Sequence, residues 1–379
     1  MVNKNRDICI VTWYGTQNYG SSLQSYGLST VLKNMGYNVS FLGYFKVYPF
    51  LFRHPNMLYA RLINKLNRKK TNGFFNPVPY EISEKRKQRL EIFKKTAYKT
   101  CIFTSSAQWK KAIKDKMIFV SGSDILWNPA LGYPAARFLD FAYYAKLSRF
   151  SYASSVGALE LPRKYYKAYK RYLGSMKAVG VREESVKKML EPIIKREVTQ
   201  VVDPTLLLTK DDWSAFSEKA EVSVPISDNG YILCYFVMND KRYWEYVKLI
   251  AKICNKQIIV LPMHKMDEEQ PYDVVLDGTP PEFVWLIKNA DFICTDSFHA
   301  CVISSVFHKE FYLLRRTRKA ENAKYDDFLN RYGLSERSII DESKFELLQQ
   351  TDYSIFDKRI QEDRKHAMAF LRSALNKCE

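Results

Sequence analysis

Residues 7–44 read DICIVTWYGTQNYGSSLQSYGLSTVLKNMGYNVSFLGY, and this stretch decides the fold class. The apolar run at 7–15 predicts a strand that ends at a glycine. Segment 21–36 places apolar residues at helical spacing, namely Leu23, Tyr26, Leu28, Val31, Leu32 and Met35. It ends at Gly36, a residue that commonly terminates a helix. A second apolar run at 37–44 predicts another strand. A strand, a helix and a strand in this order are typical of a parallel sheet.

The same alternation continues along the chain and restarts after a polar linker. Further strands are expected at 116–124, 149–158, 176–183, 230–238, 256–263, 291–296 and 309–316, with helices between them. Residues 218–229 are polar and lack periodicity, so the linker is expected near 205–229. This pattern predicts two doubly wound, Rossmann-like α/β domains, an arrangement similar to the two-domain GT-B-like glycosyltransferase fold.

The expected domain boundaries follow from this alternation. Residues 1–205 form the first domain, with a basic, aromatic insertion at 46–116, and residues 206–354 form the second. Residues 355–379 predict an amphipathic helix that can cross back to the first domain. A chain of 379 residues with 46% hydrophobic residues is long enough to bury two cores.

The cysteine usage and the apolar runs indicate an intracellular protein. No CxxC pair or metal-ligand spacing occurs among the seven cysteines: Cys9, Cys101, Cys234, Cys254, Cys294, Cys301 and Cys378. The apolar run near the N-terminus is short enough to be a first strand and not a secretory signal. No apolar stretch reaches the length of a membrane span. We expect a cytoplasmic protein, with peripheral contact at the inner face of the membrane left open.

The net charge of +18 is concentrated in one segment. Residues 46–116 hold 18 Lys or Arg and 4 Asp or Glu, a local balance of 18 − 4 = +14. Three interpretations are open: a solvated basic helical face, a surface that docks on anionic lipid, and nucleic-acid binding. No recognition pattern for nucleic acid accompanies the charge, so no nucleic-acid partner is expected.

The strongest candidate site is Thr295-Asp296-Ser297-Phe298-His299-Ala300, where a strand gives way to a helix. Ligands of open α/β sheets bind beyond the carboxyl ends of strands, where helix N-termini present N–H groups to anions. His299, Ser297 and Asp296 would therefore surround an anion. The alternative is that Asp296 or Ser297 only caps the helix.

Two further segments follow predicted strands. Arg182 could fork onto a carboxylate or phosphate, or it could pair with a neighbouring glutamate. Asp124 could act as a base toward a hydroxyl, and Trp127 could stack on a sugar ring. The alternative for this second segment is a tight turn capped by Asp124.

Two weaker candidates complete the set. The loop with Asn18 and Tyr19 either lines an interdomain cleft or caps the first helix, and it does not fit the phosphate-binding P-loop pattern. Arg315 and Arg316 follow the last predicted strand, where they either add positive potential beside the site or form a solvated loop.

In this order, the segments NYGSSLQSYGL, GSDILWNP, YASSVG, VGVREES, VVDPTLLL and TDSFHA resemble the polysaccharide pyruvyl transferase family. The resemblance spans residues 10 to about 310. It implies a fold of the two-domain glycosyltransferase type, with the first domain on the acceptor side and the second on the donor side. It also implies phosphoenolpyruvate as donor and donor-phosphate contacts at Arg182 and His299. Ser297 stands where family members often carry an arginine, so Arg315, Arg316, Arg318 or Lys265 substitutes for it, or the donor differs.

The resemblance implies transfer of a pyruvyl group onto a sugar hydroxyl of a cell-surface polysaccharide precursor, with formation of a ketal. His299 is then the general acid or a phosphate ligand, and Asp124 is the base. The acceptor is a saccharide or a lipid-linked saccharide, and neither a metal nor another cofactor is expected. A nucleotide-sugar glycosyltransferase and a non-catalytic binding module remain the alternatives.

Overall fold

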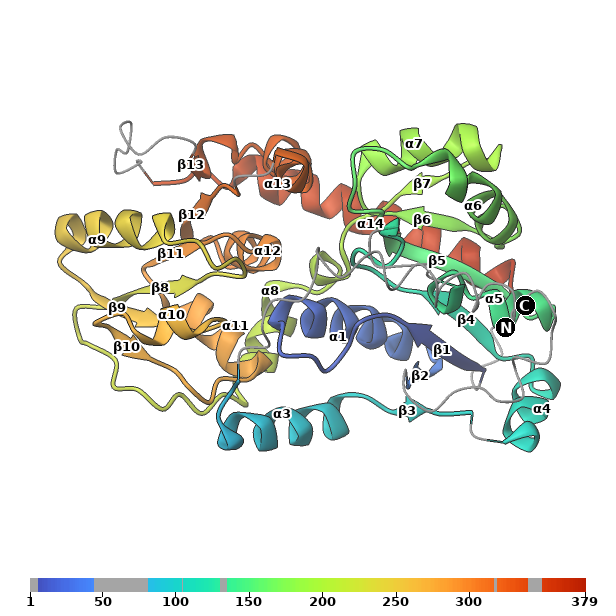
Figure 1. The fold of residues 1–379 in the computed structure, drawn as a ribbon, viewed down its shortest axis with the longest axis horizontal. Coiled ribbons are helices and arrows are strands. Elements are labelled where there is room, and N and C mark those ends of the chain that lie inside the picture. Colours follow the sequence, from blue (N-terminus) through green and yellow to red (C-terminus); the bar gives the residue numbers. More distant parts are fainter. Residues whose placement is uncertain (1–5, 44–80, 104, 130–134, 317–318, 340–349) are drawn as a thin grey trace.

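The structure, a computed structural model, describes residues 6–43, 81–103, 105–129, 135–316, 319–339 and 350–379. Two parallel sheets lie at opposite ends of the molecule, and helices pack around them (Figure 1). The first sheet has the strand order β3-β2-β1-β4-β5-β6-β7. Its strands are β1 (Asp7–Val11), β2 (Asn38–Leu42), β3 (Thr100–Cys101), β4 (Ile118–Ser121), β5 (Arg149–Ser154), β6 (Val179–Val181) and β7 (Thr199–Gln200).

The second sheet repeats this topology in the order β10-β9-β8-β11-β12-β13. Its strands are β8 (Tyr231–Tyr235), β9 (Gln257–Val260), β10 (Asp273–Val274), β11 (Phe292–Thr295), β12 (Glu310–Leu314) and β13 (Ser338–Ile339). In each sheet the order reverses beside the first strand, which is the doubly wound arrangement. The expected fold class is confirmed.

Helices connect and cover the strands. The first domain holds α1 (Tyr19–Asn34), α3 (Glu84–Ala97), α4 (Ser106–Lys114), α5 (Asp140–Tyr144), α6 (Tyr166–Leu173) and α7 (Glu184–Ile194). The rest of the chain holds α8 (Lys210–Ser217), α9 (Arg242–Cys254), α10 (Lys265–Glu268), α11 (Pro280–Asn289), α12 (Phe298–Val306), α13 (Lys319–Tyr332) and α14 (Ser354–Asn376). Short 3₁₀ turns lie at Ala135–Phe138, Arg163–Tyr165, Pro204–Leu206 and Ser335–Arg337.

Helix α1 begins two residues before the expected start at residue 21. The side chain of Asn18 accepts a hydrogen bond from the backbone N–H of Ser21, which satisfies one of the free N–H groups of the first turn. This cap extends the helix to Tyr19 and places its N-terminus at the junction of the two domains, where Tyr19 donates to the carbonyl of Gly278 at 3.0 Å.

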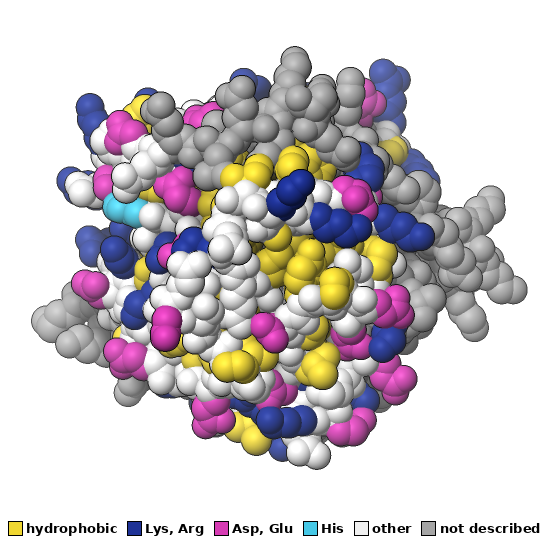
Figure 2. Space-filling view, turned by 90° about the vertical axis from the view of Figure 1, so that its left-hand side faces the viewer, with side chains coloured by type: hydrophobic (Ala, Val, Ile, Leu, Met, Phe, Trp, Pro, Cys, Tyr) yellow, Lys and Arg dark blue, Asp and Glu magenta, His cyan; other side chains and the backbone are white. Residues whose placement is uncertain are grey.

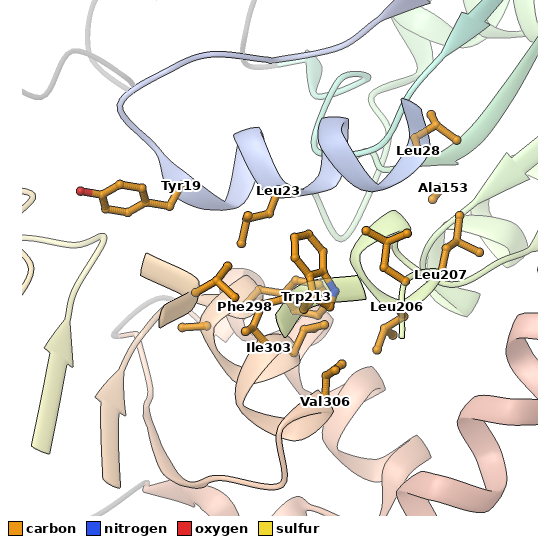
Figure 3. Close-up of a cluster of buried hydrophobic side chains, with 14 of the residues drawn as sticks. Tyr19, Leu23, Leu28, Ala153, Leu206, Leu207, Trp213, Phe298, Ile303 and Val306 are labelled. Atoms are coloured by element: carbon orange, nitrogen blue, oxygen red, sulfur yellow. The ribbon is translucent and has the colours of Figure 1, made fainter. Parts of the chain in front are cut away.

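One apolar cluster joins the two domains. Leu23 of α1 and Phe298 of α12 both belong to it, together with Leu206 and Trp213 from the connecting segment (Figure 3). Close approach is possible at Gly27, where a β carbon would come within 2.5 Å of the carbonyl oxygen of Pro204. Burial of this apolar surface is the main force that holds the carboxyl ends of the two sheets toward each other.

Helix α14 returns from the second domain to the first. Near its start, Asp357 pairs with His308 of the second domain at 2.8 Å. Near its end, Phe370 lies so close to Gly180 of β6 that a β carbon there would come within 2.8 Å of its ring. The last helix therefore bridges both domains, as Figure 1 shows for the red helix that passes behind β5 and β6.

Part of the basic segment 46–116 lies outside the described residues, and the rest includes α3, whose cations bind the second domain. Arg86 donates to the carbonyl of Pro262 at 3.0 Å, and Arg89 pairs with Glu282 at 2.7 Å. Lys85 pairs with Asp277 at 2.6 Å. These charges hold the two domains together and are not simply a solvated face.

On the end face of the second domain, the described side chains include both acidic and basic groups. Figure 2 shows acidic and basic side chains interspersed there around apolar ones. Across the described ranges, every helix is too short or too polar to cross a membrane.

Candidate functional site

His299 is the second residue of α12 and lies between the domains. Ser297 caps this helix by accepting a hydrogen bond from the N–H of Ala300 at 3.4 Å. The side chain of His299 is 10% exposed and packs against the first turn of α1, where a β carbon on Gly20 would stand 2.2 Å from Nδ1. The other ring nitrogen, Nε2, lies 3.5 Å from Oδ2 of Asp203.

Asp203 is the centre of a cluster of polar side chains that includes Arg182 and His299. It follows β7 and is fully surrounded by protein. Its Oδ1 accepts hydrogen bonds from the N–H and the hydroxyl of Thr205, while Oδ2 accepts one from Ser123 at 3.2 Å and one from Arg182 at 2.9 Å. Burial opposes its charge, but His299 and Arg182 outweigh burial and hold the pKa of Asp203 far below its usual range.

Arg182 follows β6 and is held by two carboxylates. Nε donates to Glu183 at 2.8 Å and Nη1 to Asp203, while the guanidinium lies 4.7 Å from the ring centre of Phe298. Burial works against its charge, yet Glu183 and Asp203 raise its pKa well above the ordinary value. Nη2 forms no hydrogen bond to any described residue, so it is available to an anion.

Asp124 follows β4 and faces the first turn of α1. Its Oδ2 accepts a hydrogen bond from the hydroxyl of Ser21 at 3.0 Å. Its backbone is left-handed, with φ of +78°, and its carbonyl accepts the N–H of Ser155 at 3.0 Å. Strained backbone of this kind persists only where its surroundings fix it, and it aims the carboxylate at the interdomain site. Ser123 links it to Asp203.

Three expected residues, Arg182, His299 and Asp124, are thus brought together. Asn18 and Ser297 are the caps of the two helices that meet beside them. The residue that joins them, Asp203, was not among the expected site residues. The only signal for it was its place in the VVDPTLLL segment, directly after a predicted strand.

Lys324 of α13 also belongs to this cluster and was not predicted. Burial, and then the positive charges of Arg316 and Arg182, lower its pKa to about 7. Asp124 and Glu183 oppose this shift. Nothing in the surrounding sequence AENAKYDDF sets this lysine apart from an ordinary helical surface residue.

A small cavity of about 60 Å³ lies beside these groups at the junction of the two domains and α14. Cationic, anionic and aromatic side chains share its wall, among them Arg182, Asp203, Phe298, Lys324, Arg331 and Asp363. Within the described residues, no three His, Cys, Asp or Glu side chains are placed to hold a metal ion.

Asp296 does not face a ligand. It is completely buried, and its carboxylate accepts the N–H groups of Val237 and Met238 at 2.5 and 3.1 Å. Arg316 pairs with it at 3.3 Å. This carboxylate therefore ties the loop after β8 to the loop after β11.

Trp127, Tyr19 and Arg315 also have structural surroundings. Trp127 has no exposed surface and stacks on Phe138, so it presents no ring face to a sugar. Tyr19 is buried in the domain junction. Nη2 of Arg315 donates to both carboxylate oxygens of Asp326, at 2.6 and 2.8 Å, which leaves Arg315 poorly placed to substitute for an arginine at position 297.

Comparisons with known proteins bear on both the sequence and the fold. Residues 18–318 match the profile of the family described as polysaccharide pyruvyl transferase. The sequence matches none of the curated proteins with which it was compared.

Among solved structures, UDP-GlcNAc 2-epimerase from Methanocaldococcus jannaschii is similar, with 14% identity, a TM-score of 0.50, and 96% of this chain and 92% of that chain covered. The UDP-GlcNAc 2-epimerase from Neisseria meningitidis bound to UDP-GlcNAc gives 12% identity, a TM-score of 0.49, and coverages of 98% and 94%. A UDP-glucosyltransferase from Polygonum tinctorium gives 9% identity and a TM-score of 0.44, with 99% of this chain and 98% of that chain covered. At this identity the similarity to the first structure concerns the fold alone.

Proposed function

Because the chain belongs to the polysaccharide pyruvyl transferase family, we propose that it transfers a pyruvyl group from phosphoenolpyruvate to a sugar of a cell-surface polysaccharide precursor, as a ketal. The acceptor is a saccharide, free or lipid-linked. One observation carries the proposal: between the carboxyl ends of the two sheets, Asp203 joins His299 to Arg182, whose Nη2 forms no hydrogen bond to any described residue.

The chemistry requires two sugar hydroxyls and one enol phosphate. One carbon–oxygen bond forms from each hydroxyl to the central carbon of the donor, and the bond from that carbon to the phosphate oxygen breaks. The two sugar hydroxyls each lose a proton. One of these protons is balanced by the proton that is added to the methylene carbon of the donor, which becomes a methyl group, and the other leaves with the phosphate. No oxidant or reductant takes part.

The site residues match these needs. The free edge of Arg182 pairs with the carboxylate or phosphate of the donor. Nε2 of His299 lies 3.5 Å from Asp203 and Nδ1 lies against Gly20, and the imidazole is the group that acts as acid or hydrogen-bonds the departing phosphate. The distance of 3.5 Å is long for a hydrogen bond, and catalytic contacts of this kind commonly shorten when substrate binds. Asp124 is the base toward a sugar hydroxyl.

Calorimetric titration with phosphoenolpyruvate and, separately, with a panel of nucleotide sugars tests the donor. Phosphoenolpyruvate should bind, and with an oligosaccharide acceptor the protein should release inorganic phosphate. His299→Ala should abolish release while the fold persists by circular dichroism. Binding of a nucleotide sugar and not of phosphoenolpyruvate would replace the proposal by a glycosyltransferase.

A further inference from the structure

Lys324 differs from the other cations of its neighbourhood because it has no anionic partner among the described residues. Arg315 pairs with Asp326, Arg316 with Asp296, and Arg331 with Asp363. The Nζ of Lys324 lies 5.0 Å from the ring centre of Tyr325, and it forms no hydrogen bond or ion pair with any described residue.

Most acids near Lys324 are already engaged, and the one that is not, Asp327 of the same cavity, leaves Oδ2 without a hydrogen-bond partner among the described residues. Glu183 and Asp203 bind Arg182, and Asp296 binds Arg316 and two backbone N–H groups. Asp124 accepts the Ser21 hydroxyl and the N–H of Ile125. An ammonium group that is half-buried beside two arginines without an acceptor destabilises the ligand-free protein.

The position of Lys324 matches that of a ligand contact. It lines the small cavity together with Arg182, Asp203 and Phe298. Helix α13 is fixed over the start of α12, because Tyr325 donates to the carbonyl of Asp296 at 2.6 Å and Phe328 packs edge-on to Phe298 at 5.6 Å. The amine is therefore held at the site by packing and not by a charge partner.

We infer that Lys324 is an anion-binding residue of this site, and that with Arg182 it holds the carboxylate or phosphate of the donor. This inference rests on the proposed function for the identity of the donor. Two cations from different domains then contact one ligand, so the donor itself contributes to holding the domains together.

Donor binding should then change the protonation of Lys324. The charged and titratable groups that interact with it are Arg316 after β12, Arg182 and Glu183 after β6, Asp124 after β4, Asp296 after β11, and Cys301 within α12. Without a ligand, burial and then the two arginines favour the neutral amine, whereas a bound anion favours the ammonium form. At pH 8 the protein should therefore take up a proton as the donor binds.

Three variants of the full chain test the inference: Lys324→Met, Lys324→Arg and the control Lys188→Met, which removes an exposed lysine of α7. Lys324→Met should bind phosphoenolpyruvate about tenfold or more weakly, as loss of a charge-assisted hydrogen bond predicts. It should also melt at a higher temperature than the wild type without ligand. Lys324→Arg should keep its affinity for phosphoenolpyruvate but take up no proton on binding. The number of protons taken up is measured by calorimetric titration in two buffers of different ionisation enthalpy.

The outcomes separate this inference from the proposed function. Unchanged affinity for phosphoenolpyruvate in Lys324→Met would overturn the inference and leave the function standing. If the wild type binds pyrophosphate but not phosphoenolpyruvate, and Lys324→Met loses that binding, the function fails and the inference stands. If the wild type binds neither anion, the inference is overturned.

Discussion

Gly20 and His299 are in direct contact: a β carbon on Gly20 would stand 2.2 Å from Nδ1 of the imidazole and 2.7 Å from Cγ. Gly20 belongs to the first turn of α1 in one domain, and His299 to the first turn of α12 in the other. The imidazole can occupy its place only because the facing helix lacks a side chain there. The candidate site therefore depends on close docking of the two domains.

Gly20→Ala should displace His299 and lower kcat/KM by about 100-fold, the scale expected for a misplaced catalytic group. Alanine favours a helix by up to about 1 kcal/mol over glycine, so a loss of folding stability would come from the clash. Steady-state phosphate release and thermal melting measure the two effects. In the double variant with His299→Ala, the stability lost to Gly20→Ala should be recovered, and additive losses would contradict the contact.

Asp203→Asn should lower the free energy of unfolding at pH 7 by about 3–5 kcal/mol, because Arg182 loses one of its two buried carboxylates. The pKa of Asp203 is lower in the folded than in the unfolded chain, so the unfolded chain binds the proton first as the pH falls. The contribution is full above about pH 5 and decreases progressively below about pH 4. Melting temperatures from pH 7 to pH 3 should fall more steeply in the wild type than in Asp203→Asn, and parallel curves would refute this role.

Lys324 should make the ligand-free protein more stable at alkaline pH. Its pKa of about 7 in the folded chain lies below the value near 10.4 in the unfolded chain, so the unfolded chain binds more protons between these values. Stability then rises as the pH increases from 7 to 10. The melting-temperature advantage of Lys324→Met should be largest at or below pH 7 and shrink toward pH 10. A constant advantage would show that the amine is not titrating in that range.

Arg182→Lys should raise the KM for the donor about tenfold or more. A guanidinium can bind two carboxylates and an anion through its planar, forked set of N–H groups, and an ammonium group lacks this arrangement. Arg364→Lys is a matched control, because among the described residues the guanidinium of Arg364 hydrogen-bonds to the carbonyls of Leu206 and Leu208, at 2.7 Å each, and to no carboxylate. The control should lower the melting temperature and leave the KM unchanged. Equal KM effects in both variants would point to a general structural loss.

Trp127→Phe should cost about 1–3 kcal/mol of stability, because a fully buried indole is replaced by a smaller ring and its hydrogen bond to the carbonyl of Arg137 is lost. The KM for the acceptor should stay at the wild-type value. A large increase in that KM without loss of stability would restore the sugar-stacking role that the sequence suggested.

The sequence determined the two parallel sheets, the helices between them and the strand-to-helix turns that carry His299, Arg182 and Asp124. These features follow from local periodicity, because the spacing of apolar residues along a segment predicts a strand or a helix without reference to distant parts of the chain. The match of residues 18–318 to one family profile agrees with this.

Only the tertiary structure decided which polar residues meet. Asp203 joins Arg182 to His299, Lys324 finds no partner in the part of the chain that the structure describes, and Asp296 and Trp127 are enclosed by protein. Each of these facts depends on segments from different parts of the chain. Burial and charge pairing arise from long-range packing, so residues of the same type and local pattern acquire different roles once the domains dock.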